Sequence, residues 1–385
     1  MRTVSWITSS ALCALVAATS ARADVDINSC GQEIPAGQVG TLRVDLDCPV
    51  ETNPVNNAIR MGSRSTLLLN GHSVRGAAET ITAYLANGTV RIIGPGQIVD
   101  AGLDNPFVGV AVNVGHGRLD LRDVVITNAK IAVFLFNSSA NVSDTTIDGG
   151  RQGIIYRAET GSEKGGRLRA SNLAIGPGDG ASPGIDVLQL NAQNVSVTGR
   201  SDGIVVSRLK GEDVTSSQNA GDGIRADLIK ADRVTASDNS NDGIHAARLV
   251  GDDVTASGNG DEGIVATKLK GSRYTASQNF SIGIAGGDVR LSDVIADENG
   301  QGVTGSGITA QNAQLEGVHA TGNSGAGVEA SLKLSIENST LTGNASGGLG
   351  IDLVSGTFPS LLATTCGRSS SSLFALNSWG VCGGD

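Results

Sequence analysis

The chain has 385 residues, of which 54 are glycine, 3% are aromatic and 17% are charged. A hydrophobic fraction of 39% is too high for a disordered chain, and the glycines follow no Gly-X-Y period, which excludes collagen. The formal net charge of -10 argues against nucleic acid or an anionic membrane as the main partner. We therefore expect a folded, acidic protein with no nucleic-acid or membrane partner.

The first 23 residues have the pattern of a secretory signal peptide. Arg2 gives a positive start, residues 11–18 are apolar, and Ala21-Arg22-Ala23 fits the small-x-small cleavage rule. No later segment approaches the roughly 20 apolar residues that a membrane-spanning helix needs. We expect residues 1–23 to be removed and the remainder to be a soluble monomer, secreted to the extracellular space or the periplasm.

Four cysteines follow the signal segment, in two close pairs at opposite ends of the chain: Cys30, Cys48, Cys366 and Cys382. Four cysteines allow three pairings, and the spacing favours a local bridge within each close pair. No histidine or carboxylate is spaced with them as a metal site would require. We therefore expect two disulfides that close terminal caps, at residues 24–50 and 353–385.

Residues 51–200 carry short apolar runs at irregular spacing. Runs of this kind, bounded by glycine and proline, predict short β-strands, here at 67–69, 90–93, 119–121 and 195–197. The tetrapeptide Ile-Gly-Pro-Gly occurs at 93–96 and again at 175–178, which indicates one turn repeated on the same skeleton. The longest interruption of the rhythm falls at 149–183.

Residues 201–352 repeat with a period of 20 residues. Gly-Ile recurs with its glycine at Gly203, Gly223, Gly243, Gly263 and Gly283. Asparagine recurs in the same register at Asn219, Asn239, Asn259, Asn279 and Asn299, and the register continues to Asn323 and Asn344 after one four-residue insertion. A fixed period of this length is typical of stacked supersecondary units.

The repeat unit predicts strands and no helix. Apolar residues alternate with polar ones over short runs, and β-branched residues dominate them. Twenty residues, less the turns, make three short strands, and stacked coils place each residue about 4.8 Å above its copy. We expect a single all-β domain, a parallel β-helix with a ladder of asparagine side chains. Its open ends would expose strand edges, which the two disulfide-closed caps cover.

A resemblance follows from the cysteines and the first coils. The order of features along the chain resembles that of bacterial secreted right-handed parallel β-helix proteins of the pectin-lyase-like superfold. Cys30 and Cys48 come first, then Leu67-Leu68-Leu69-Asn70-Gly71-His72-Ser73-Val74-Arg75-Gly76, and then the coils. The resemblance covers nearly all of the exported chain and implies a right-handed solenoid. The superfold includes polysaccharide lyases, polygalacturonases and mannuronan C5-epimerases, but also phage tailspikes and adhesins. Fold alone does not choose between these activities.

The catalytic motifs of these enzymes are incomplete in the sequence. Polygalacturonases carry Asn-Thr-Asp, Asp-Asp, Gly-His-Gly and Arg-Ile-Lys in that order. Here Gly115-His116-Gly117 is present, but Asp252-Asp253 and Arg208-Leu209-Lys210 follow it in the wrong order and Asn-Thr-Asp is missing. The Asp-Pro-His-Asp string of the epimerases is absent as well. The polygalacturonase interpretation fails, whereas pectate-lyase-like chemistry, which needs Ca²⁺ ligands beside an arginine or lysine base, is neither supported nor excluded.

The interruption at 149–183 is the strongest candidate site, because long loops on regular scaffolds often carry function. Elimination next to a uronate carboxyl needs a proton-transfer group and cations that stabilise the enolate. The candidates for proton transfer are Tyr156, His116 and Lys164, and the candidates for substrate binding are Arg151, Arg157 and Arg167. The alternative is an ordinary surface insertion.

Three sets of charged residues recur with the repeat. One alternates in sign, at Asp213, Arg233, Asp253, Arg273 and Asp293; alternation avoids stacked like charges and is expected to be structural. A second set is acidic, at Asp202, Asp222, Asp242 and Glu262. These side chains either cap turns, which we favour, or bind Ca²⁺; no metal ligand or cofactor is assigned.

The third set is basic, at Arg208, Lys210, Lys230, Arg248, Lys268, Lys270 and Arg290. These positions share one face of an extended strand. They form either a solvated surface, which we favour, or a lengthwise track for an acidic polysaccharide.

Two functional hypotheses remain. The first, which we favour, is recognition of an acidic extracellular polysaccharide, with lyase or epimerase activity left open. The second is a non-catalytic surface or structural rod.

Overall fold

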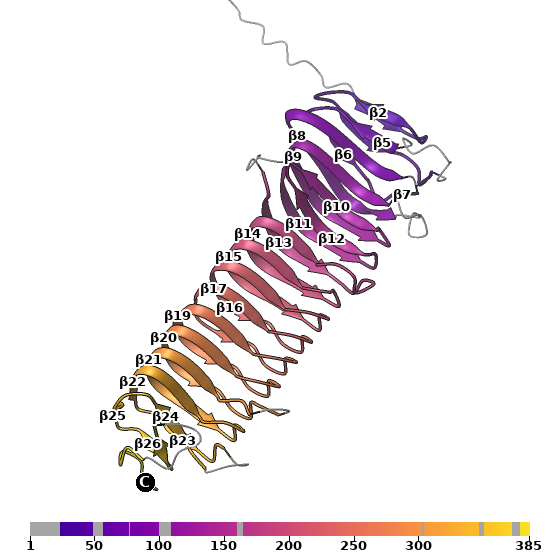
Figure 1. Ribbon diagram of the computed structural model, residues 1–385. Coiled ribbons are helices and arrows are strands. Elements are labelled where there is room, and N and C mark those ends of the chain that lie inside the picture. Colours follow the sequence, from indigo (N-terminus) through magenta and orange to yellow (C-terminus); the bar gives the residue numbers. More distant parts are fainter. Residues whose placement is uncertain are drawn as a thin grey trace, which may run out of the picture.

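The computed structural model describes residues 24–48, 57–76, 78–99, 109–159, 165–301, 304–345, 350–371 and 378–385. Over these residues the chain forms a right-handed parallel β-solenoid of about 14 turns, drawn as an elongated rod in Figure 1. The predicted all-β fold is confirmed. The predicted signal peptide (1–23) and Lys164 lie outside the described residues. Within the described part, no helix is long and apolar enough to cross a membrane.

The first coils contain short strands followed by one long strand. These are β1 (Asp24–Ile27), β2 (Gln32–Ile34), β3 (Val39–Leu42), β4 (Leu46–Asp47), β5 (Asn57–Met61), β6 (Thr66–Leu68), β7 (Ser73–Arg75) and β8 (Glu79–Val99). The irregular middle coils contain β9 (Val110–Thr127), β10 (Ile131–Phe136), β11 (Ser139–Asp148), β12 (Gln152–Arg157), β13 (Arg167–Ile175) and β14 (Ile185–Thr198).

In the regular coils a strand often continues around the bends of the coil instead of breaking into three. These strands are β15 (Ile204–Ser217), β16 (Ile224–Thr235), β17 (Ile244–Val250), β18 (Val254–Thr255), β19 (Ile264–Thr275), β20 (Ile284–Ile295) and β21 (Ile308–Thr321). The last coils contain β22 (Val328–Glu337), β23 (Thr340–Thr342), β24 (Leu353–Ser355), β25 (Ser360–Leu362), β26 (Thr365–Cys366) and β27 (Ser369–Ser370).

Each coil pairs in parallel with the next, copy over copy. In β15 and β16 the register joins Ile204 to Ile224, Leu209 to Ile229 and Val214 to Val234. These apolar copies point inward and are fully buried, so the core is a stack of near-identical layers. The 20-residue period of the sequence is therefore the circumference of one coil.

The asparagine repeat forms the predicted ladder inside the turn. Asn239 donates from its side-chain nitrogen to Oδ1 of Asn259 at 3.0 Å, and Asn259 donates in the same way to Asn279 at 3.0 Å. Each Oδ1 also accepts the backbone N–H of the preceding asparagine, and these side chains are buried. The ladder continues across the four-residue insertion, where Asn299 donates to Asn323 at 3.0 Å.

The ladder ends on charged side chains of opposite sign. At its start, the backbone N–H of the fully buried Arg200 donates to Asn219, while the Arg200 guanidinium donates to the carbonyls of Gly176 and Gly149. At its end, the buried carboxylate of Asp352 accepts from the Asn344 side chain. All the amides point the same way, so the open oxygen at the start of the ladder meets the Arg200 backbone N–H, and the open nitrogen at its end meets the Asp352 carboxylate.

Tyr274 is the exception in the core. It replaces the valine found at this position in the neighbouring coils, pairing with Val254 and Val294. Gly271 makes room for the ring, since a Cβ there would lie 3.0 Å from a ring carbon of Tyr274. The side chain is fully buried, its hydroxyl has no hydrogen-bond partner among the described residues, and burial raises the pKa of the phenol.

We expect Tyr274→Phe to raise the free energy of unfolding by about 1 kcal/mol, because it removes a buried hydroxyl that makes no hydrogen bond. Chemical denaturation of the two proteins measures this difference. Tyr274→Val is the matched variant: it also removes the hydroxyl but leaves a cavity, and should be less stable than Tyr274→Phe. A destabilised Tyr274→Phe protein would contradict the assignment.

The terminal disulfides are those predicted. Cys30 bonds to Cys48 and Cys366 bonds to Cys382, with sequence separations of 18 and 16 residues. The C-terminal coil is further held by Asp385, whose carboxylate accepts hydrogen bonds from Ser369 and from the backbone of Cys382. The division of the chain into caps, irregular coils and regular coils remains a prediction.

Candidate functional site

Each coil presents outward side chains on three faces. In β15 the first face carries the outward residues of 204–207, the second those of 208–212, and the third those of 214–217, after a turn at Asp213. The residue at that turn has positive φ in successive coils, 55° at Asp213 and 53° at Arg233. Arginine is unusual in this conformation. Here the geometry places its side chain along the rod, directly over the preceding coil.

The alternating charges of this turn form ion pairs between coils. Arg233 contacts Asp213 through both Nε and a terminal nitrogen, at 2.6 and 2.9 Å, and Arg273 contacts Asp253 likewise at 2.5 and 2.8 Å. Bidentate contacts of this kind are among the stronger surface pairs. The structural interpretation of the alternating column agrees with these contacts.

The second face carries two columns of basic side chains, here called the basic columns. The strand register aligns Arg167, Gln189, Arg208, Leu228, Arg248 and Lys268 in one column and Arg169, Asn191, Lys210, Lys230, Val250, Lys270 and Arg290 in the other. Nine of these thirteen residues are cationic, and all nine are exposed. Seven coils at about 4.8 Å spacing make a basic strip roughly 30 Å long.

The cations of the basic columns are not neutralised within the described residues: none of the nine forms an ion pair there. Most other arginines of the rod do pair, as in Arg157 with Asp186 and Arg225 with Asp222, both at 2.7 Å. Further pairs involve Arg43, Arg91, Arg122, Arg151, Arg233 and Arg273. The basic columns therefore keep a positive charge on a protein of net charge -10.

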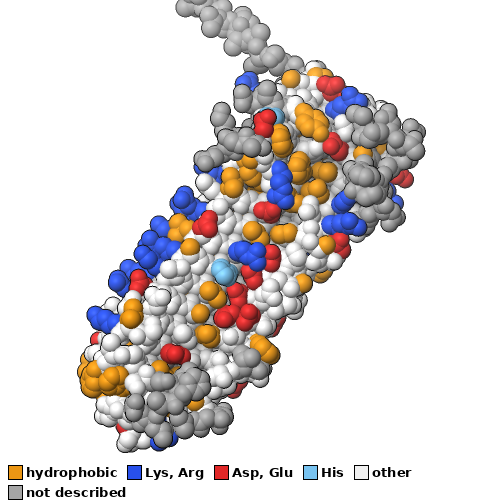
Figure 2. All heavy atoms as spheres, in the orientation of Figure 1, with side chains coloured by type: hydrophobic (Ala, Val, Ile, Leu, Met, Phe, Trp, Pro, Cys, Tyr) orange, Lys and Arg blue, Asp and Glu red, His pale blue; other side chains and the backbone are white. Residues whose placement is uncertain are grey.

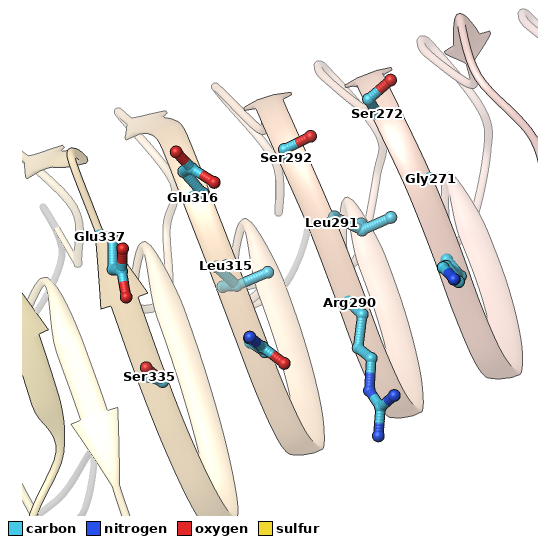
Figure 3. A pocket seen from close by; sticks show the side chains of 11 residues that line it. Gly271, Ser272, Arg290, Leu291, Ser292, Leu315, Glu316, Ser335 and Glu337 are labelled. Carbon is cyan, nitrogen blue, oxygen red and sulfur yellow. The ribbon is translucent and has the colours of Figure 1, made fainter.

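Hollows lie between the basic columns and the coils that follow. One of about 190 Å³ is lined by four cations, Arg248, Lys268, Lys270 and Arg290, and by Asp288, which follows Lys268 in its column. One of about 380 Å³ continues from Asp288 and Arg290 to Lys333. Figure 3 shows a third, of about 370 Å³, with Arg290 at one side, Leu291 and Leu315 between, and Glu316 and Glu337 at the other. In Figure 2, lysine and arginine side chains form a row along one long edge of the rod.

The first face carries a larger groove, of about 760 Å³. It runs across several coils, from Tyr156 and Arg157 to Thr267, and its lining includes Arg157, Asp186, Arg225, Asp227 and His245. Both arginines have the carboxylate partners given above, and Nδ1 of His245 lies 3.0 Å from Asp242. The hydrogen bonds that Arg225 donates to Asp222, together with the charge of that carboxylate, raise the pKa of Arg225. The groove thus combines hydrogen-bonding groups with little unbalanced charge.

Tyr156 lies at the end of this groove. In the strand register it is paired with the fully buried Leu135, and its own side chain is 6% exposed. Burial raises the pKa of the phenol, so at neutral pH it carries its proton. In this state Tyr156 can donate a proton or a hydrogen bond but is a poor base.

His116 is two coils away from Tyr156 in the register, since Leu135 pairs with Val114 as well as with Tyr156. The His116 ring is exposed and contacts Phe136 edge-to-face, with ring centroids 5.4 Å apart. Phe136 pairs in turn with Arg157. The structure therefore brings His116 and Arg157 to one end of the first face, where Tyr156 is packed mostly into the core.

The other predicted binding residues lie elsewhere. Arg151 precedes β12 and Arg157 ends it, which separates them by about 20 Å of extended strand, and Arg151 pairs with Asp179 at 3.0 Å. Arg167 begins β13 and belongs to the basic columns, aligned with Arg208 through Gln189. Arg169, which was not predicted as a binding residue, lies beside it. The sequence did not indicate that Arg169 belongs to the basic columns, because the irregular coils do not keep the 20-residue spacing that aligns the later members.

The acidic set beside the Gly-Ile turn caps the turns of the coils that follow. One carboxylate oxygen of Asp202 accepts the backbone N–H of Asp222 at 2.9 Å, and Asp222 and Asp242 do the same for the next coils at 3.3 and 3.2 Å. Burial and the neighbouring Asp242 raise the pKa of Glu262. These contacts agree with the capping interpretation; Asp222, Asp242 and His245 are also close enough together to hold a metal ion, and Ca²⁺ binding stays untested.

Comparison with known proteins gives no family for the chain. No family model matches it, and no curated protein matches it. Two solved structures are similar to it over most of its length, both A-modules of mannuronan C-5 epimerases from Azotobacter vinelandii. The AlgE4 module has 11% identity over 91% of this chain and 90% of that chain, with a TM-score of 0.36. The AlgE6 module has 10% identity over 89% and 91%, with a TM-score of 0.24.

Proposed function

We propose that this protein binds an acidic polysaccharide along the basic columns, with the polymer lying parallel to the rod. The observation that carries the proposal is the set of nine exposed cations, stacked over seven coils, that form no ion pair with any described residue. The rest of the rod is acidic and repels a polyanion, so long-range attraction is confined to this strip.

The dimensions of the strip favour a polymer over a small anion. A small anion meets the cations of one or two coils, whereas an extended polymer with a charge on each sugar meets all of them. The basic columns contain no aromatic side chain, so they offer no stacking surface for the bases of a nucleic acid. The two disulfides fit an oxidising compartment, and we place the protein in the extracellular space or the periplasm.

Binding to polygalacturonate and to alginate at low salt tests the proposal. We expect Lys268→Gln with Lys270→Gln to weaken binding about threefold to thirtyfold, because each exposed contact contributes up to about 1 kcal/mol. Added salt should weaken binding by the wild-type protein. The matched control is Arg60→Gln with Arg75→Gln, which removes the same charge outside the basic columns and should change binding less than twofold.

The same assay separates this proposal from its alternatives. We propose the predicted residues Tyr156 and His116, with Arg157, as the candidates for catalysis at the end of the first face; Arg151 lies away from them, before β12, and Lys164 lies outside the described residues. If Arg157→Ala weakens binding more than the Lys268 and Lys270 changes, the site lies on the first face and not on the basic columns. Absorbance of an unsaturated product, with and without Ca²⁺, reports lyase activity. If the wild-type protein binds no uronate polymer at low salt, the structural-rod hypothesis takes its place.

A further inference from the structure

A second polar cluster lies at the start of the first face, on β8 and β9. The hydroxyl of Tyr84 lies 3.2 and 3.3 Å from the two carboxylate oxygens of Glu79, and the side-chain nitrogen of Asn113 donates to that hydroxyl at 3.1 Å and to Glu79 at 3.0 Å. Thr82 donates to the other Glu79 oxygen at 2.9 Å. Three donors thus fix the carboxylate, and two partners fix the phenol.

The ring of Tyr84 is nevertheless open to solvent, with the residue 67% exposed. It lies against Gly115 of the next coil, where an added Cβ would come within 3.1 Å of a ring carbon. Phe136 follows Gly115 in the same column, and His116 contacts Phe136 edge-to-face. Two aromatic rings therefore flank a glycine on a chain in which only 3% of residues are aromatic.

Asn113 leaves one polar atom unsatisfied. Its residue is 5% exposed, and its side-chain oxygen has no hydrogen-bond partner although its nitrogen has two. Buried acceptors in folded proteins nearly always have a donor. This oxygen is itself shielded from solvent, so the role of Asn113 is to hold the exposed Tyr84 and the Glu79 carboxylate in place through its nitrogen.

We propose that Tyr84, Glu79 and Asn113, with Phe136, form a carbohydrate-binding ledge that is separate from the basic columns. The ligand class is a hexopyranose: one face of the sugar ring packs on the exposed ring of Tyr84, and a sugar hydroxyl bonds to the Glu79 carboxylate that Asn113 and Thr82 hold in place. Large aromatic surfaces with a few placed polar groups are the usual composition of ligand sites. The ledge provides no net positive charge, so binding here does not require an acidic sugar.

The ledge continues into the groove of the first face. Tyr84 pairs with Gly115, Gly115 with Phe136, and Phe136 with Arg157, which lines the groove. An oligosaccharide anchored at Tyr84 therefore extends along the rod into a groove of about 760 Å³. The affinity of this site should therefore depend on the length of the oligosaccharide: longer oligosaccharides should bind more tightly than a disaccharide.

Ligand-observed NMR with a panel of neutral and uronic oligosaccharides tests the ledge, at about 0.5 M NaCl, where contacts between exposed charges are screened. We expect the wild-type protein to bind at least one oligosaccharide under these conditions. Tyr84→Ala should abolish the signal, and Tyr84→Phe, which keeps the ring and loses the hydroxyl, should weaken binding about tenfold. Gly115→Ala, which displaces the ring, should also weaken binding.

Two controls keep this result distinct from polyanion binding. Phe280→Ala removes another exposed aromatic ring and should bind as the wild type does. The Lys268→Gln and Lys270→Gln protein should keep high-salt oligosaccharide binding even where it loses low-salt polyuronate binding. Circular dichroism confirms that each variant keeps its fold. The ledge is overturned if the wild-type protein binds no sugar of the panel at high salt, or if Tyr84→Ala binds as well as the wild type.

Discussion

Asn259→Ala should lower the free energy of unfolding by about 3–5 kcal/mol, because it removes one member of the buried ladder and leaves its neighbours unpaired. Oδ1 of Asn259 accepts from both the backbone and the side chain of Asn239, and its nitrogen donates to Asn279 and to the carbonyl of Ala236. Each buried group left without a partner costs about 1–3 kcal/mol. Equilibrium denaturation in guanidinium chloride measures the loss.

A matched variant exists in the preceding turn. Asn241 is exposed, and Asn241→Ala should change the free energy of unfolding by less than about 0.5 kcal/mol. The comparison separates the ladder from any general effect of removing an asparagine. Equal stability of the Asn259 and Asn241 variants would show that the ladder contributes little.

Removing the C-terminal disulfide, by Cys366→Ala with Cys382→Ala, should lower the free energy of unfolding by about 3 kcal/mol. The bridge closes a loop of 16 residues over the last coils and so restricts the unfolded chain. Cys366 belongs to β26, which pairs with β23. Amide hydrogen exchange should therefore increase first in β23–β27.

The equivalent pair at the other end is the control. Cys30→Ala with Cys48→Ala should increase exchange first in β1–β7 and leave β23–β27 protected. Loss of protection spread evenly along the rod in both variants would contradict the view that each bridge stabilises its own cap.

The regular half of the fold was predictable because the period of its sequence equals the length of one coil. A 20-residue period fixes which residues stack, so the buried isoleucines, the asparagine ladder and the alternating turn charges all follow from spacing alone. The disulfides followed from the closeness of each cysteine pair. The sequence did not predict that strands continue around the bends of a coil. The backbone hydrogen bonds between coils persist at the bends, where the alternation of inward and outward side chains is interrupted.

The irregular half was harder to predict because a shift of one residue moves a side chain to the opposite side of a strand. Arg167 and Arg208 share a column although they are 41 residues apart with Gln189 between them. Tyr84 and Asn113 meet across 29 residues, a separation that no period in the sequence indicates. By contrast, Arg151 and Arg157 are close in sequence but lie at opposite ends of one strand.

The asparagine ladder limits how such a protein can change in length. Every ladder asparagine presents the same acceptor to the coil before it and the same donor to the coil after it, so one coil can replace, follow or precede another. Loss or duplication of a whole coil leaves the joint unchanged, whereas loss of half a coil leaves an amide facing apolar residues. Extra residues are accepted only in the turns, as in the segment between Asn299 and Asn323, where the ladder bond is kept. A gene encoding this rod can therefore lengthen or shorten it by duplicating or deleting whole repeats, while the ends that carry Arg200 and Asp352 stay in place.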